Sequence, residues 1–182
     1  MERLIEIDDR ATGLRAAIAI DSTALGPAAG GVRTRGYPSF ADAQADARAL
    51  ARAMTLKCAV AGLDAGGGKV VVWDHGAWDR EAAFERLGEA VEALGGAFRT
   101  AGDLGTSAAD LAAMARRCRH VHLDETNLAA SVARGLLGCA EACLARRRAA
   151  WDGLRVAVQG AGAIGSACAR AFAARGARLL VA

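Results

Sequence analysis

The chain has 182 residues, of which 53% are hydrophobic and 24% are charged, and its formal net charge is +3. This composition is typical of a globular protein rather than a disordered one, and so small a net charge does not indicate a nucleic-acid partner. No apolar run reaches the roughly 18 residues of a membrane span, and the start MERLIEIDDR is too charged for a signal peptide, so we expect a cytoplasmic protein.

The N-terminal third predicts a strand followed by a helix. The segment LRAAIAID, from Leu14 to Asp21, has the pattern of a strand, and a turn-prone stretch follows it. Ser39 and Asp42 have the S-x-x-D spacing of a helix N-terminus. Lys57 falls on the apolar stripe of this helix, so we expect it to face inward, where a charge needs a partner or a ligand. The stripe consists of Phe40, Ala43, Ala47, Leu50, Met54 and Cys58.

Lysine is rare in this chain, since Lys57 and Lys69 are the only lysines among 23 lysines and arginines. They flank the glycine-rich segment MTLKCAVAGLDAGGGK. A lysine exchanges its proton more readily than an arginine, because burial lowers the pKa of an ammonium. A turn from Gly62 to Gly68 leads into a predicted strand from Lys69 to Trp73, which places Lys69 at the mouth of a buried strand. The segment does not match a phosphate-binding P-loop; a Schiff-base lysine remains open.

Strands and helices continue to alternate along the chain, which predicts an α/β fold. Ser107 and Asp110 repeat the capping pattern that begins a helix. The other predicted elements are a helix from Arg80 to Leu94, a strand from Ala97 to Thr100, a loop from Ala101 to Gly105, a brief strand from Val121 to Leu123 and a long helix from about Leu128 to Arg147.

The last 32 residues have the pattern of a dinucleotide-binding unit. A strand from Leu154 to Gln159 precedes GAGAIG at Gly160 to Gly165, and a helix through Arg175 and a strand from Arg178 follow. In such units the glycines permit a tight turn and bring the pyrophosphate close to the helix N-terminus. The acidic residue that would hold the ribose is expected at or just past Ala182, so the sequence does not decide between NAD and NADP.

Five cysteines form no CxxC pair, and we interpret them as buried free thiols. Cys139 and Cys143 are four residues apart, and His120 and His122 alternate, but neither pair has further ligands at metal-site spacing. We therefore expect no metal site.

Four segments carry a family resemblance: LGPAAGGVR (Leu25 to Arg33), MTLKCAVAGLDAGGGK (Met54 to Lys69), TAGDLGTSAADL (Thr100 to Leu111) and VAVQGAGAIG (Val156 to Gly165). They resemble the Glu/Leu/Phe/Val dehydrogenases, on the leucine, valine and phenylalanine side of that family. Members are normally close to twice this length, so the resemblance implies a C-terminally truncated chain: an N-terminal α/β catalytic and oligomerisation domain at 1–150, including the linking helix 128–147, and the first βαβ portion of a Rossmann domain at 151–182.

The resemblance also implies a role for each matching residue. Lys57 corresponds to the lysine that holds the substrate α-carboxylate, and Lys69 to the lysine that activates water. Asp103 corresponds to the carboxylate that exchanges protons with the amino group, and Gly30 and Gly31 to the glycine pair beside the substrate. The implied reaction is NAD-dependent oxidative deamination of an amino acid to a 2-oxo acid, with release of ammonia, in a homo-oligomer.

One further position bears on specificity, and another departs from the family pattern. Ala29 stands where glutamate-specific relatives carry a lysine, which favours an apolar amino acid. Thr34 stands where close relatives often have methionine. The cofactor-binding residues implied by the glycine motif are Gly160, Gly162, Ala163, Ile164 and Gly165. The alternative from another class is an inactive remnant that serves as an oligomerisation or amino-acid-binding module.

Overall fold

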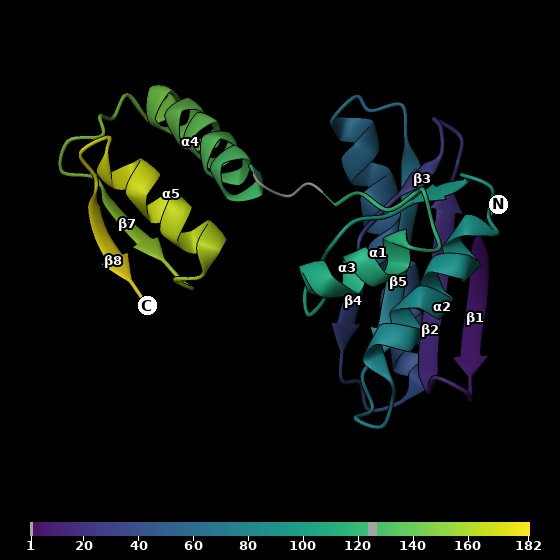
Figure 1. Ribbon diagram of the computed structural model, residues 1–182. Helices are drawn as coiled ribbons and strands as arrows, with labels where there is room; N and C mark the ends of the chain where they lie inside the picture. The colour runs from purple at the N-terminus through teal and green to yellow at the C-terminus, as the bar shows by residue number, and fades with distance from the viewer. Residues whose placement is uncertain (1, 124–126) are drawn as a thin grey trace. The chain divides into compact units, whose positions relative to one another are not determined.

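A mixed six-stranded sheet forms the centre of the N-terminal unit in the computed structural model, which describes residues 2–123 and 127–182 (Figure 1). The strands lie in the order β1-β2-β5-β3-β6, and β4 also pairs with β5. β2 is antiparallel to both β1 and β5, whereas β3 and β4 run parallel to β5. The strands are β1 (Arg3–Asp9), β2 (Leu14–Ser22), β3 (Ala28–Ala29), β4 (Val32–Arg35), β5 (Gly66–Trp73) and β6 (Phe98–Arg99).

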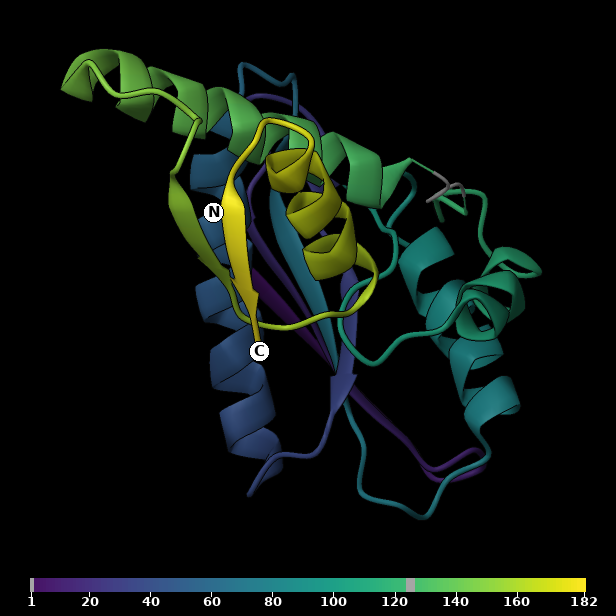
Figure 2. The ribbon, with the colours of Figure 1, turned by 90° about the vertical axis from the view of Figure 1, so that its left-hand side faces the viewer.

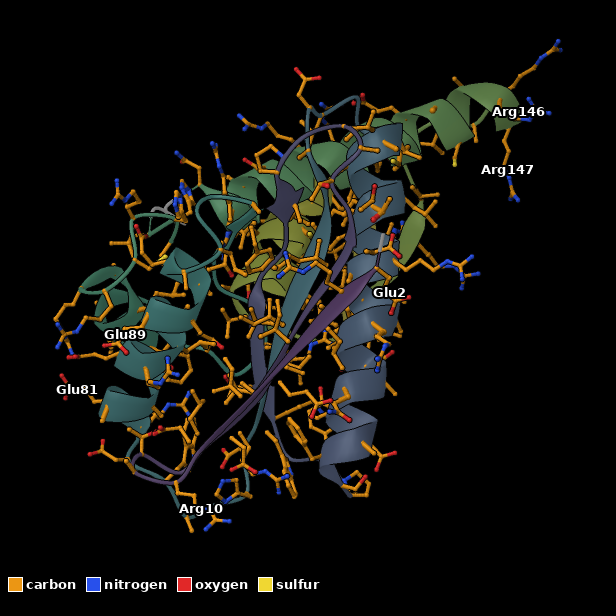
Figure 3. The ribbon with its side chains drawn as sticks, turned by 90° about the vertical axis from the view of Figure 1, so that its right-hand side faces the viewer. Glu2, Arg10, Glu81, Glu89, Arg146 and Arg147 are labelled. Atoms are coloured by element: carbon orange, nitrogen blue, oxygen red, sulfur yellow. The ribbon has the colours of Figure 1, made fainter. Side chains whose placement is uncertain are left out.

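Helices cover both faces of this sheet, as the edge-on view in Figure 2 shows. α1 (Phe40–Val60) lies on one face, and α2 (Arg80–Glu92) and α3 (Ala108–Ala115) lie on the other. Figure 3 shows Glu81 and Glu89 on the outer side of α2, where they pair with arginines that follow α3. Such exposed pairs add little stability, so apolar burial holds the layers together.

The two faces are packed differently. The α2–α3 face buries large side chains, among them Phe84, Leu87 and Met114, against alternate residues of the strands. On the α1 face the buried residues are mostly alanines of α1 and β2. Small side chains let a helix approach a sheet closely, so α1 lies nearer to the backbone of β5 than larger residues would allow.

Glycines on β5 make this close approach possible. A Cβ added to Gly67 would collide with the backbone of Thr55 and Ala51 on α1, and one added to Gly66 would collide with Ser22 on β2. The prediction of a turn from Gly62 to Gly68 is therefore wrong in its second half, because β5 begins at Gly66. Lys69 is consequently an interior residue of the strand rather than a residue at its mouth.

The segment that contains β3 and β4 breaks at the glycine pair. Ala29 pairs with Gly67 and Val32 with Val70, so Gly30 and Gly31 lie between these pairs, alongside Gly68 and Lys69. A Cβ on Gly30 would lie 2.6 Å from the carbonyl carbon of Gly68. The break thus opens beside the middle of β5, next to Lys69.

Most predicted elements of this unit are confirmed. Ser39 caps α1, and Ser107 and Asp110 form a complete capping box at the start of α3. β1 was not predicted, and it is an edge strand with only Ile7 fully buried. Instead of a strand from Val121 to Leu123, the structure has a single bridge between Thr100 and Val121.

The second unit contains α4 (Leu128–Arg147), β7 (Arg155–Val158), α5 (Ala163–Ala173) and β8 (Arg178–Val181). β7 and β8 pair in parallel, so the predicted strand, glycine turn, helix and strand are confirmed. α5 packs on both strands, and α4 packs on α5, helped by an ion pair between Glu141 and Arg175. Cys139 and Cys143 on α4 are exposed, unlike the buried thiols expected.

α4 also bears on the expectation about membrane spans. It is the one helix of the described residues that is long and apolar enough to cross a membrane, with a mean hydropathy of 1.4. A single such helix is weak evidence, since helices of water-soluble proteins often meet the same criterion. Arg134 and Glu141 interrupt its apolar sequence.

The boundary between the two compact units lies earlier in the sequence than the domain boundary expected after residue 150. The units are Met1–Leu123 and Asp124–Ala182. The linking helix falls in the second unit because α4 packs on α5. The assignment of substrate binding to the N-terminal domain and of cofactor binding to the C-terminal one remains a prediction.

Candidate functional site

Lys69 and Asp103, which are 34 residues apart in sequence, form an ion pair beside the strand break. The Nζ atom of Lys69 donates to Oδ2 of Asp103 at 2.7 Å. The side chain of Lys69 is 7% exposed and that of Asp103 is 30% exposed. The pair therefore has one buried member and one that solvent or a ligand reaches.

The loop that carries Asp103 is fixed to β4 on both sides of the carboxylate. The N–H of Val32 donates to the carbonyl of Ala101 at 2.9 Å, and the N–H of Thr34 donates to the carbonyl of Leu104 at 2.9 Å. These two bonds hold the loop along β4, so the position of Asp103 follows from backbone pairing.

Thr34 takes part in the same support. Its hydroxyl lies 2.9 Å from the hydroxyl of Thr106, which donates to the carbonyl of Val32 at 2.7 Å. Thr34 is only 4% exposed, and a buried hydroxyl needs such a partner. Thr34 thus supports the Asp103 loop through a polar contact with Thr106.

Arg33 is a second cation on Asp103, and no sequence pattern predicted this contact. Its Nε donates to Oδ2 of Asp103 at 3.0 Å, and its Nη1 donates to Oδ2 of Asp46 on α1 at 3.3 Å. Burial raises the pKa of the Asp103 carboxyl, but Lys69, the backbone N–H of Leu104 and Arg33 together lower that pKa below its usual value. Asp103 is therefore ionised at neutral pH.

The glycine pair and Ala29 surround this ion pair with backbone rather than side chains. A Cβ on Gly31 would lie 3.0 Å from the Cβ of Asp103 and 2.6 Å from the carbonyl oxygen of Gly102. Ala29 lies between Gly67 and Arg99 in the sheet and offers only a methyl group. The backbone therefore approaches Asp103 closely at the strand break, and Ala29 adds no charge there.

Lys57 lies elsewhere than expected. It occupies the last turn of α1 and is exposed, and it makes no ion pair with residues 2–123 or 127–182. The buried line of α1 runs through Ala43, Ala47 and Ala51, and Lys57 lies beside that line rather than on it. The expectation that it faces inward is wrong. Its ammonium is available to a ligand without any need to break an existing bond.

The glycine motif of the second unit has the geometry of an anion-binding turn. Gly160 has a φ of +92°, and a Cβ on Gly165 would collide with the carbonyl of Gly160. Gly162 is the N-cap of α5 and provides no side-chain cap, so the first N–H groups of the helix remain available. Ala163 and Ile164 occupy the first turn. These residues fit the pyrophosphate of a dinucleotide.

Comparison with known proteins places these observations in a family. Residues 2–120 match the model of the Glu/Leu/Phe/Val dehydrogenase dimerisation domain. The chain belongs to this family. The four segments that resembled the family in sequence include the strand break, Lys69, the Asp103 loop and the glycine turn.

Relatives within the Glu/Leu/Phe/Val dehydrogenase family differ in their named substrates. Valine dehydrogenase of Streptomyces coelicolor is 50% identical over 119 residues, which make up 65% of this chain and 33% of that protein. Phenylalanine dehydrogenase of Bacillus thermotolerans is 34% identical over 99% of this chain and 50% of its own length. The chain thus spans a third to a half of these relatives.

The solved structure of another amino acid dehydrogenase has a similar fold. L-tryptophan dehydrogenase from Nostoc punctiforme matches with a TM-score of 0.75 and 29% identity, over 98% of this chain and 52% of that one. The fold is therefore an N-terminal α/β domain followed by the opening βαβ portion of a Rossmann domain.

Proposed function

We propose that the chain contains the substrate site of an amino acid dehydrogenase. The reaction is oxidative deamination of an apolar L-amino acid of the Leu, Val or Phe type to its 2-oxo acid, with release of ammonia. The observation that carries this proposal is the half-exposed Asp103 held by buried Lys69 at the strand break. An ammonium and a carboxylate in contact supply the two proton-handling groups that deamination needs.

Each residue has a distinct task in this proposal. The exposed ammonium of Lys57 pairs with the α-carboxylate of the substrate. Asp103 accepts a proton from the amino group and later returns one to the departing ammonia. Lys69 releases its own proton to solvent, and as a neutral amine it orients the water that adds to the imine carbon and takes up the proton that this water loses. Gly30 and Gly31 let the backbone of β5 and of the Asp103 loop approach closely, which sets the position of Asp103 beside Lys69.

NAD fits the glycine turn of the second unit, and NADP is not distinguished from it by the residues present. When bound, the nicotinamide would accept the hydride from the substrate α-carbon. Gly160, Gly162 and Gly165 would shape the turn, and the free N–H groups of Ala163 and Ile164 would face the pyrophosphate. The role of these residues in the reaction would be to bind the cofactor and to orient it.

The substrate class follows from Ala29. A methyl group at this position cannot pair with a side-chain carboxylate, so a glutamate side chain would lose its solvation without compensation. The relatives named for valine and phenylalanine support an apolar side chain. We further propose a homo-oligomer, supported by the match to a dimerisation domain, and a cytoplasmic location.

Replacement of Lys69 tests the proposal. In protein expressed from the complete coding sequence, NADH formation is measured with leucine, valine and phenylalanine at saturating NAD. We expect turnover with at least one of them, and a loss of at least 100-fold in the Lys69→Ala variant with an unchanged circular dichroism spectrum. Turnover within tenfold of the unmodified protein would contradict the assignment. Amino acid binding without any NADH formation would instead support the inactive binding module.

A further inference from the structure

Arg33 connects two carboxylates that belong to different layers of the fold. Asp103 lies on the loop after β6, and Asp46 lies on α1. The guanidinium contacts the first through Nε and the second through Nη1. Its side chain is 21% exposed. A lysine could not make both contacts, because its single nitrogen cannot reach in two directions as a planar guanidinium does.

The far end of this bridge is itself held in place. The hydroxyl of Tyr37 donates to Oδ2 of Asp46 at 2.5 Å, the same oxygen that Arg33 contacts. Burial and the nearby Asp46 carboxylate raise the pKa of Tyr37, so the hydroxyl keeps its proton and stays a donor. Asp46 is therefore fixed from two sides, and it fixes Arg33 in turn.

We infer that Arg33 is a positioning residue that keeps the Asp103 carboxylate oriented while Lys69 changes its charge. The inference rests on the proposed function, in which Lys69 gains and loses a proton. When Lys69 is neutral, its attraction to Asp103 falls, and Arg33 and the backbone N–H of Leu104 remain to hold the partly exposed carboxylate. Arg33 stays charged throughout, because a guanidinium does not lose its proton under ordinary conditions.

The positioning role of Arg33 is supported by the particular oxygen of Asp103 that it contacts. Lys69 and Arg33 both donate to Oδ2 of Asp103, at 2.7 Å and 3.0 Å. Two donors from different strands on one oxygen fix the plane of the carboxylate. Oδ2 is therefore held in place, while the carboxylate exchanges protons with the substrate amino group in the proposed reaction.

The test is a titration of the Asp103 carboxyl by carbon-13 NMR in the 182-residue chain. The variants are Arg33→Gln and Arg33→Lys, each also made with Lys69→Met to imitate the neutral lysine. Arg35→Gln is the matched control, because Arg35 lies on the same face of β4, is exposed and contacts Tyr37 rather than Asp103. The charged groups that face Asp103 are Lys69 from β5 and Arg33 from β4.

We expect the Asp103 titration midpoint to rise in Arg33→Gln and to rise further when Lys69→Met is added. Arg33→Lys should restore part of the difference, whereas Arg35→Gln should leave the midpoint at the level of the unmodified chain. Equal midpoints for Arg33→Gln and Arg35→Gln would overturn the inference. Loss of the folded spectrum in both Arg33 variants would also overturn it, because the arginine would then serve the fold. The titration needs no turnover, so it is independent of the NADH assay that tests the proposed function.

Discussion

Gly31 lies so close to Asp103 that a Cβ on the glycine would be 3.0 Å from the Cβ of the aspartate. The same Cβ would lie 2.6 Å from the carbonyl oxygen of Gly102, which is backbone and cannot turn aside. The absence of a side chain at residue 31 is therefore what brings the Asp103 loop against β4.

The Gly31→Ala variant should push the Asp103 loop away from the segment that joins β3 and β4. We expect a loss of about 1–3 kcal/mol in the free energy of unfolding, the usual cost of overpacking a close contact. Urea denaturation followed by circular dichroism measures it. Gly138→Ala is the control, because Gly138 lies inside α4 with no atom close to its Cβ position; there we expect a gain of about 0.5–1 kcal/mol. A stability loss at residue 138 as large as that at residue 31 would contradict this explanation.

The two lysines should respond differently to removal. Lys57 is exposed and unpaired among the described residues, whereas Lys69 is buried and bound to Asp103. We expect Lys57→Ala to leave the melting temperature within about 2 °C, since exposed substitutions change stability little. It should weaken 2-oxo acid binding by at least tenfold, as isothermal titration calorimetry can measure. Unchanged affinity would remove Lys57 from the proposed site.

Stability should depend on the ionisation of Asp103. Its pKa is lower in the folded chain than in an unfolded one, so its contribution is fully present above the unfolded value of about 3.9. That contribution is lost as the pH falls through the folded pKa. The difference in unfolding free energy between the unmodified chain and Asp103→Asn should therefore be constant from pH 7 to about pH 5 and shrink below about pH 4. A difference that grows on acidification would be inconsistent with this sign.

Asp110 should matter for the fold alone. It is 5% exposed, caps α3 together with Ser107, and accepts two hydrogen bonds from Arg80. Burial raises its pKa, but Arg80 and Ser107 together lower it, so it is charged at neutral pH. We expect Asp110→Ala to cost about 2–3 kcal/mol in thermal or denaturant unfolding, against about 1 kcal/mol for Ser107→Ala. Substrate binding should be unchanged in either variant at temperatures where the chain is folded.

Local patterns predicted much of the fold. The capping residues Ser39 and Ser107 marked the starts of α1 and α3, because a side-chain cap needs only a spacing of three residues. The strand, glycine turn, helix and strand at the C-terminus were equally readable. β1 was not, since an edge strand exposes much of its surface and carries charged residues that hide the alternation.

The site was harder to predict. Lys69 and Asp103 were assigned from motifs, but Arg33 contacts Asp103 across 70 residues of sequence, and only the sheet topology brings them together. The exposure of Lys57 depends on which side of α1 packs on the sheet. The apolar stripe in the sequence does not define where the buried face of the helix ends. The glycines before Lys69 predict a turn, because glycine usually ends regular structure. In the structure they lie in β5 and let α1 pack closely against the strand.

The contact between α1 and Gly67 has a consequence for how such a site can evolve. Where a helix meets a strand through backbone atoms, the separation of the two elements is a property of the main chain and not of any rotamer. At this point of contact the spacing of the two layers does not depend on which side chains fill the core around it. Selection can thus alter the surrounding sequence freely while the lysine on α1 and the lysine on β5 keep a constant separation. A single methyl group at position 67 would remove that independence.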